Sequence, residues 1–80
     1  MFEMRHLNHN DLFMEYDDEG DEIALWLFKK KSKREGVIKL VKDYSGVNEE
    51  GKELDIDINE SYYGDYSIIG NAEDYPEYLI

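Results

Sequence analysis

Residues 11–31 read DLFMEYDDEGDEIALWLFKKK, and the spacing of apolar residues in this stretch predicts a β-hairpin. Two runs place an apolar residue at every second position, namely Leu12, Met14 and Tyr16, and then Ile23, Leu25 and Leu27. Side chains alternate between the two faces of a strand, so each run has an apolar face. The segment DDEGDE between the runs is polar and contains a glycine, which is typical of a turn.

The second of these runs is apolar on both of its faces. Its opposite face consists of Ala24, Trp26 and Phe28. A strand of this kind is usually buried on both faces, so we expect it to lie in the middle of a sheet.

Residues 53–67, ELDIDINESYYGDYS, predict another alternating strand followed by a group of aromatic residues. One face of that strand would carry Leu54, Ile56 and Ile58, and the other face Asp55, Asp57 and Asn59. After Gly64, the segment DYSII predicts a short last strand that ends at Gly70. Short strands joined by polar, glycine-containing turns predict a mainly β fold, a small antiparallel sheet of hairpins or a meander that folds on itself.

Residues 32–46, SKREGVIKLVKDYSG, are compatible with either a helix or a strand. A helix is supported by a capping box at Ser32 and Glu35 and by apolar residues at helical spacing: Val37, Leu40, Val41 and Tyr44. A strand is supported by Gly36, which weakens a first helical turn, and by the β-branched residues of the segment. We expect the strand. The alternative is an α+β fold with one short helix at about residues 33–45.

The length of 80 residues indicates one small acidic domain over residues 1–80, in which residues 71–80, NAEDYPEYLI, are a candidate for a loosely held tail. No run of about 18 apolar residues is present, so we expect no transmembrane helix. The segment MFEMRHLNHND has no apolar stretch of signal-peptide length, and the chain has no cysteine. We therefore expect a cytoplasmic protein without disulfides.

Charge is the strongest signal, because 20 acids against nine bases give a net charge of −11. Residues 1–28 hold eight acids and one base, residues 29–42 hold one acid and seven bases, and residues 43–80 hold eleven acids and one base. Such a charge repels nucleic acid and anionic membranes and attracts basic proteins. We interpret the basic run KKKSKRE as a solvated turn that pairs with the protein's own acids.

No catalytic, cofactor or metal motif is recognisable. With Gly20 at the sixth position of an EF-hand calcium loop, the twelfth position is Trp26, where a glutamate is required. His6 and His9 lie in a polar segment that is typical of exposed histidines. The chain also has no cysteine nucleophile and no glycine-rich phosphate loop. We expect no enzymatic activity, no catalytic residue, no cofactor and no metal site.

Acidic residues and tyrosines are the candidates for a surface that binds a partner protein. The acidic candidates are Asp17, Asp18, Glu19, Asp21, Glu22, Glu49, Glu50, Glu53, Asp55, Asp57 and Asp65, and the aromatic candidates are Tyr62, Tyr63 and Tyr66. Same-face residues of a strand are about 6.7 Å apart, and one strand of B-DNA carries a phosphate about every 3.4 Å of axis. An acidic strand flanked by acidic turns can therefore present charge at a density like that of DNA, while tyrosines add apolar contact area. Whether the acids of residues 17–22 and the acids of residues 49–57 are neighbours depends on the fold.

In size, charge, absence of cysteine and mixture of aromatic and acidic residues, the chain resembles small phage-encoded inhibitors that imitate DNA. That class includes inhibitors of uracil-DNA glycosylase, anti-restriction proteins and some anti-CRISPR proteins. The resemblance implies a DNA-mimicking inhibitor that occupies the nucleic-acid-binding groove of a host defence or DNA-processing protein in the host cytoplasm.

The expected partner is therefore a basic protein, such as a nucleic-acid-binding protein or a nuclease, with no direct contact to nucleic acid or membrane. The protein itself is expected to be a monomer or a homodimer. Two alternatives stay open: an immunity or antitoxin protein for a basic toxin, and a small regulatory protein-binding module without mimicry.

Overall fold

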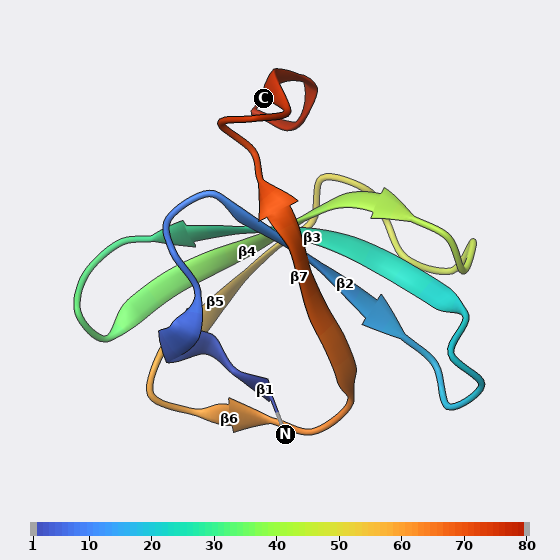
Figure 1. Cartoon of the computed structure of the whole chain (residues 1–80), viewed down its shortest axis with the longest axis horizontal. Coiled ribbons are helices and arrows are strands. Elements are labelled where there is room, and N and C mark those ends of the chain that lie inside the picture. Colours follow the sequence, from blue (N-terminus) through green and yellow to red (C-terminus); the bar gives the residue numbers. More distant parts are fainter. Residues whose placement is uncertain (1, 80) are drawn as a thin grey trace.

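The computed structural model describes residues 2–79, and this part of the chain forms seven β-strands and two short 3-10 helices (Figure 1). The strands are β1 (Phe2–Glu3), β2 (Asp11–Tyr16), β3 (Glu22–Lys30), β4 (Glu35–Asp43), β5 (Glu53–Asp57), β6 (Ser61–Tyr62) and β7 (Asp65–Asn71). The 3-10 helices are η1 (Met4–His6) and η2 (Pro76–Tyr78). All strand pairs are antiparallel, so the prediction of a mainly β, antiparallel fold is confirmed.

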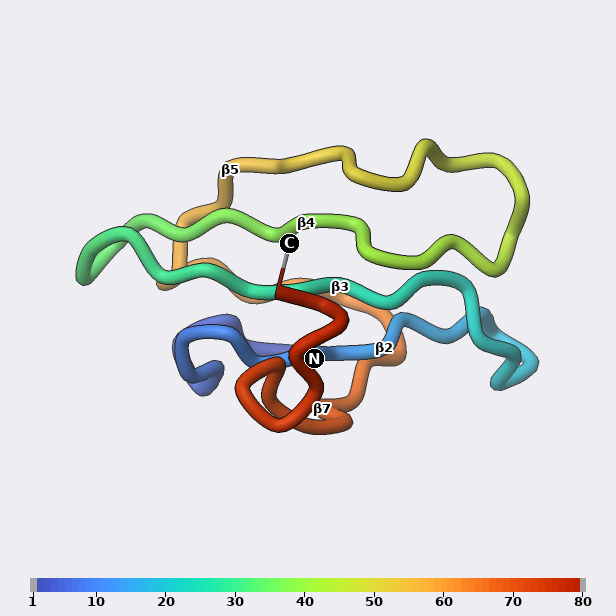
Figure 2. The backbone as a smooth tube through the Cα atoms, turned by 90° about the horizontal axis from the view of Figure 1, so that it is seen from above, coloured from blue at the N-terminus to red at the C-terminus, as the bar shows by residue number. Residues whose placement is uncertain are grey.

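Five strands form one sheet in the order β5-β4-β3-β2-β7, and β1 pairs with β6 in a separate two-stranded ribbon. Strands β2 to β5 follow one another as a meander, and Figure 2 shows β2, β3, β4 and β5 running side by side. Strand β7 then pairs with the other side of β2. The chain between β5 and β7 therefore passes from one edge of the sheet to the other, and β6 lies on this path (Figure 1).

The sheet has an apolar core on each face. The first core consists of Met4, Leu7, Phe13, Ala24, Trp26, Phe28, Ile38, Leu40, Ile56 and Ile58. The second core consists of Leu12, Met14, Leu25, Leu27 and Ala72. Strand β3 contributes to both cores, and its residues from Ala24 to Phe28 are all buried. The expectation that this strand is central is thus confirmed.

Each core is covered by segments that lie outside the five-stranded sheet. Phe2 and Tyr62 of the β1–β6 ribbon pack against the first core. Ala72 and Tyr78 of the C-terminal segment pack against the second core, where Ala72 is fully buried. Both residues belong to residues 71–80, the stretch that we considered as a loosely held tail. Ile80 lies outside the described residues.

Residues 35–43 form strand β4, so the alternative of a short helix at residues 33–45 is wrong. Strand β4 pairs with β3 on one side and with β5 on the other, so the sheet satisfies its backbone hydrogen bonds. Successive residues Val37 and Ile38 are both buried, as expected when a strand is covered on both faces. Such positions suit β-branched side chains better than a helix does.

Gly36 of β4 lies against the ring of Phe28, and this close approach provides a test of the packing. A Cβ atom at position 36 would lie 2.6 Å from Phe28 Cε1 and 3.2 Å from the carbonyl oxygen of Lys29. Phe28 is fully buried, so its ring cannot move aside without disturbing the first core. We predict that Gly36→Ala lowers the free energy of unfolding by about 1–3 kcal/mol, as overpacking does in other cores.

Urea denaturation measures this change. The matched control is Lys33→Ala in the exposed turn before β4, which is expected to change the free energy of unfolding by less than about 0.5 kcal/mol. A Gly36→Ala variant that is as stable as the Lys33→Ala variant would show that the ring does not occupy this position.

Candidate protein-binding surface

Two acidic turns lie at the same end of the five-stranded sheet (Figure 1). The β2–β3 turn and the β4–β5 turn are both there because β3 begins where β4 ends. Ala24 pairs with Asp43, and the N–H of Tyr44 donates to the carbonyl oxygen of Ile23 at 2.8 Å. We call residues 17–22 and 43–50 the acidic end. Within these residues there are eight acids and no lysine or arginine, while Lys42 and Lys52 lie within two positions of the second segment. The acids are Asp17, Asp18, Glu19, Asp21, Glu22, Asp43, Glu49 and Glu50.

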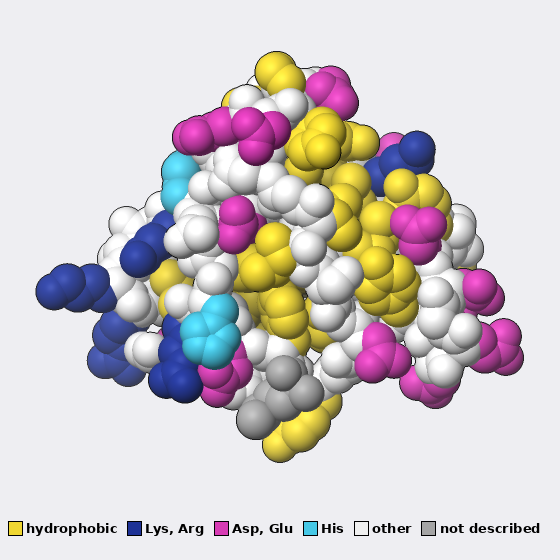
Figure 3. Space-filling view, in the orientation of Figure 1, with side chains coloured by type: hydrophobic (Ala, Val, Ile, Leu, Met, Phe, Trp, Pro, Cys, Tyr) yellow, Lys and Arg dark blue, Asp and Glu magenta, His cyan; other side chains and the backbone are white. Residues whose placement is uncertain are grey.

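The β3–β4 turn carries positive charge at the opposite end of the same strands. We call residues 29–35 the basic end, and it contains five bases and one acid: Lys29, Lys30, Lys31, Lys33 and Arg34, with Glu35. In Figure 3, lysine and arginine gather at the left, where this turn lies in Figure 1, and acids predominate at the right. The two signs of charge are therefore separated along the length of the strands.

Asp17 holds the first acidic turn in shape. Its Oδ1 accepts hydrogen bonds from the N–H groups of Glu19 and Asp21, both at 2.9 Å. Gly20 has a φ of +86°, a conformation that glycine adopts without strain. With the chain turned in this way, the side chains of Asp18, Glu19, Asp21 and Glu22 are all exposed.

Asp43 has the same role in the second acidic turn, although it was not among the candidates from the sequence. Its carboxylate accepts from the hydroxyl of Ser45 at 2.7 Å and from the N–H of Asn48 at 2.9 Å. These bonds, with the Ser45 hydroxyl first, lower the pKa of Asp43. Glu50 Oε2 in turn accepts from the N–H of Asp43 at 3.0 Å. In the sequence, the run Asp43-x-Ser45 beside Gly46 indicates this turn, since such residues commonly form turns through their side chains.

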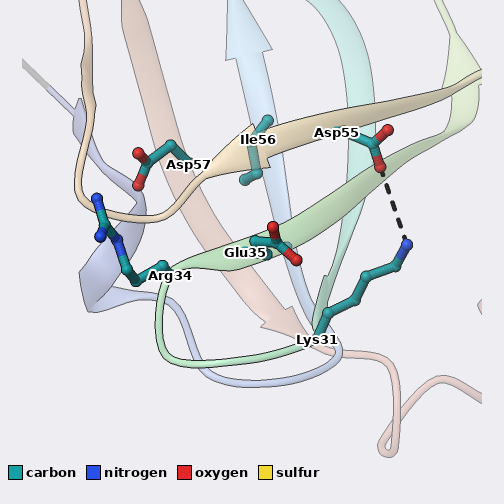
Figure 4. A pocket seen from close by; sticks show the side chains of 7 residues that line it. Lys31, Arg34, Glu35, Asp55, Ile56 and Asp57 are labelled. Carbon is teal, nitrogen blue, oxygen red and sulfur yellow. Dashed lines mark ion pairs between the residues drawn. The ribbon is translucent and has the colours of Figure 1, made fainter.

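The acids of β5 lie away from the acidic end. Strand β5 runs back along β4, so Asp55 pairs in register with Val37 and Asp57 with Glu35, the first residue of β4. Figure 4 shows a recess at the basic end in which Lys31 points to Asp55 and Arg34 lies on the side of Asp57.

The Lys31 Nζ to Asp55 Oδ1 distance is 3.9 Å, and the two side chains are 60% and 92% exposed, so this ion pair adds little stability. The acidic turns and the pair Asp55 and Asp57 of β5 therefore lie at opposite ends of the strands and do not form one continuous surface. Glu53 lies between these groups, opposite Lys39 in the register of β4 and β5.

The tyrosine candidates differ in exposure. Tyr66 packs on Phe2 and Phe13 with ring centroids 5.1 Å and 6.0 Å apart, and burial raises its pKa. Tyr62 is partly buried against the first core, and burial raises its pKa too. Tyr63 is 86% exposed. Asp65, the acidic candidate among them, is exposed at the start of β7.

Two exposed hydrophobic side chains that were not among the candidates from the sequence lie in the acidic end. Tyr44 is 43% exposed and Val47 is 84% exposed. Lys42 Nζ lies 5.2 Å from the ring centroid of Tyr44, a distance typical of a cation–π contact. The acidic end thus combines exposed carboxylates with apolar contact area.

The two histidines make separate interactions. His6 Nε2 lies 3.3 Å from Glu3 Oε2, and His9 Nδ1 accepts from the N–H of Lys30 at 3.0 Å. Within residues 2–79, no three histidine or acidic side chains are arranged to hold a metal ion. The same part of the chain contains no helix that is long and apolar enough to span a membrane.

The chain matches no protein-family model, and comparisons with curated proteins and with solved structures found no significant match. Its function is therefore inferred from its own surface, whose main features are the acidic end, the basic end and the exposed side chains of Tyr44, Val47 and Tyr63.

The hydrogen bonds to Asp43 predict how stability depends on pH. The pKa of Asp43 is lower in the folded protein than in the unfolded chain, so these bonds contribute stability at pH values above the unfolded pKa of about 4. This contribution is lost as the pH falls through the lowered pKa. We predict that Asp43→Asn destabilises the protein at pH 7 and that the difference from the unchanged protein shrinks towards about pH 3.

Thermal denaturation at several pH values measures this difference. Asp18→Asn is the control, because Asp18 is exposed in the other acidic turn and is expected to show no loss of stability at pH 7. An Asp43→Asn defect that is the same at pH 7 and at pH 3 would contradict the role of the charged carboxylate.

Repulsion within the acidic end predicts a dependence on salt. The Debye length falls from about 30 Å at 0.01 M to about 8 Å at 0.15 M ionic strength, so salt screens the eight acids from one another. We predict that the unfolding temperature rises over this range of sodium chloride. The rise should be smaller for a variant that combines Asp18→Asn, Glu19→Gln and Asp21→Asn. A fall in the unfolding temperature of the unchanged protein would contradict the prediction.

Proposed function

We propose that this protein is an acidic inhibitor that binds a basic partner protein at its nucleic-acid-binding groove, and that the acidic end makes the contact. The observation that carries the proposal is the separation of charge: eight acids at one end, flanked by Lys42 and Lys52, and five bases with one acid at the other. A groove that binds nucleic acid presents lysines and arginines to phosphates, and the acidic end offers carboxylates in their place.

The separated charge also favours one orientation of binding. A basic groove attracts the acidic end and repels the basic end, so the protein approaches with residues 17–22 and 43–50 in front. Long-range attraction of this kind raises the rate of association and weakens as salt is added. The basic end would then face away from the partner.

Exposed apolar side chains within the acidic end supply contacts that charge alone does not. Tyr44 and Val47 lie among the acids of the second turn. A few well-buried apolar or aromatic contacts carry most of the affinity of a typical interface, while charged residues at the rim mainly set specificity and rate. Burial of Tyr44 and Val47 against the partner would therefore slow dissociation.

The proposed contact surface differs from the one expected from the sequence. Asp17, Asp18, Glu19, Asp21, Glu22, Glu49 and Glu50 remain in it. Asp55 and Asp57 lie at the basic end beside Lys31 and Arg34, so the proposal assigns them no contact. An immunity or antitoxin protein for a basic toxin would use the same surface, and the identity of the retained partner distinguishes the two roles.

The test is affinity capture from a nuclease-treated bacterial extract with the tagged protein. Three forms are compared: the unchanged protein, an acidic-end variant (Asp18→Asn, Glu19→Gln, Asp21→Asn), and a control variant of equal charge (Glu73→Gln, Asp74→Asn, Glu77→Gln). All six acids are exposed, so both variants are expected to fold. We predict that the unchanged protein and the control variant retain a nucleic-acid-binding protein, which added DNA or RNA displaces, and that the acidic-end variant retains at least tenfold less.

Two results would contradict the proposal. Retention of a partner that is indifferent to added nucleic acid would exclude competition for a nucleic-acid-binding groove. Equal loss of retention in both variants would show that total charge, rather than the acidic end, determines binding.

A further inference from the structure

A recess opens between the sheet and the β6–β7 segment, on the side of the first core. It has a volume of about 230 Å³, and its wall includes Phe13, Glu15, Trp26, Leu54, Tyr62 and Tyr66. Phe13 and Trp26 are buried, Tyr62 and Tyr66 are partly buried, and Leu54 is 40% exposed. The recess therefore has a buried aromatic floor and a partly exposed rim.

Glu15 places a carboxylate in this apolar wall. It is partly buried, and its Oε1 accepts a hydrogen bond from the indole Nε1–H of Trp26 at 3.1 Å. In the register of the sheet, Glu15 lies between Ala24 of β3 and Tyr66 of β7, neither of which carries a positive charge. No lysine, arginine or histidine within residues 2–79 forms an ion pair with Glu15. A carboxylate that is partly removed from water gains from a cation that could enter beside it.

The other groups around the recess also favour a cation. Aromatic rings attract cations through the negative potential of their faces, and tryptophan and tyrosine do so most strongly. Glu15 lies close enough to Tyr66, and Asp57 and Glu60 close enough to Tyr62, for their charges to raise the pKa of these tyrosines further beyond the effect of burial. The potential at the rim is therefore negative, while both tyrosines stay protonated at neutral pH.

We propose that this recess binds an alkylammonium group, namely the side chain of a lysine of the basic partner, with the ammonium next to Glu15 and the methylenes against the aromatic wall. Its volume suits one such side chain rather than a folded element. Glu15 is followed in the chain by Tyr16 and the first acidic turn, so a lysine can reach the recess while neighbouring bases contact the acidic end. The identity of the lysine's owner rests on the proposed function, whereas the chemistry of the recess does not.

The first experiment titrates the isotope-labelled protein with n-butylammonium, which has the chemistry of a lysine side chain, and in parallel with the neutral analogue n-butanol. Trp26 is the only tryptophan, so its indole N–H gives one assigned signal at the wall of the recess. We expect a saturable shift with n-butylammonium at millimolar concentration and at least tenfold weaker binding of n-butanol. Equal affinity for the amine and the alcohol, or a shift that does not saturate, would overturn the proposal.

Three variants test which residues are responsible. Glu15→Gln keeps an acceptor for the Trp26 indole N–H but removes the charge, and it is expected to weaken n-butylammonium binding at least fivefold. Glu73→Gln, at an exposed residue of the C-terminal segment outside the acidic end, removes an equal charge and is expected to change the affinity less than twofold. Leu54→Lys, at the exposed rim, supplies an ammonium from the chain itself and is expected to abolish the saturable shift even if Glu15→Gln does not fold.

Equal effects of Glu15→Gln and Glu73→Gln, or unchanged binding in Leu54→Lys, would overturn the site. These results are independent of the capture experiment. Failure of nucleic acid to displace the captured partner would contradict the proposed function and leave the amine site intact. Failure of the amine titration would remove the recess and leave the acidic end as the proposed contact.

Discussion

Burial of β3 on both of its faces is the constraint on which the rest of the structure depends. Ala24, Trp26 and Phe28 lie in one core, and Leu25 and Leu27 lie in the other. One sheet cannot cover both faces of its own central strand, so other parts of the chain have to do so. The β1–β6 ribbon covers the first core, and the segment with Ala72 and Tyr78 covers the second. In this way residues 2–79 form apolar packing on both faces of the five-stranded sheet.

The distribution of charge follows from the meander. In an up-and-down arrangement of four strands, alternate turns lie at the same end of the sheet. The β2–β3 and β4–β5 turns are both acidic and meet at one end, and the β3–β4 turn is basic and lies at the other. The recess beside Glu15 lies on the side of the first core, where the path from β5 to β7 crosses the sheet. A single topology therefore places the acidic end, the basic end and the aromatic recess.

Local patterns were sufficient for several parts of the fold. The alternation around residues 11–31 predicted the hairpin and its central strand, and the turn at Gly20 was recognisable from composition. Residues 35–43 were ambiguous because their apolar spacing fits a helix as well as a doubly covered strand. Pairing with β3 and β5 resolves that ambiguity, and this pairing involves residues distant in the sequence. The contacts of Ala72 and Tyr78 with the second core are equally non-local.

The sequence alone determined the class of fold, the excess of acid, and the separation of acidic segments by a basic one, because strand period and charge are properties of neighbouring residues. Tertiary structure decided which acids act together. It places residues 17–22 at the same end of the sheet as residues 43–50, and it places Asp55 and Asp57 at the basic end. It also buried part of Tyr62 and Tyr66, exposed Tyr44 and Val47, and brought Glu15 to Trp26. These outcomes depend on strand order and direction, which follow from burying both faces of β3 and not from any short stretch of the chain.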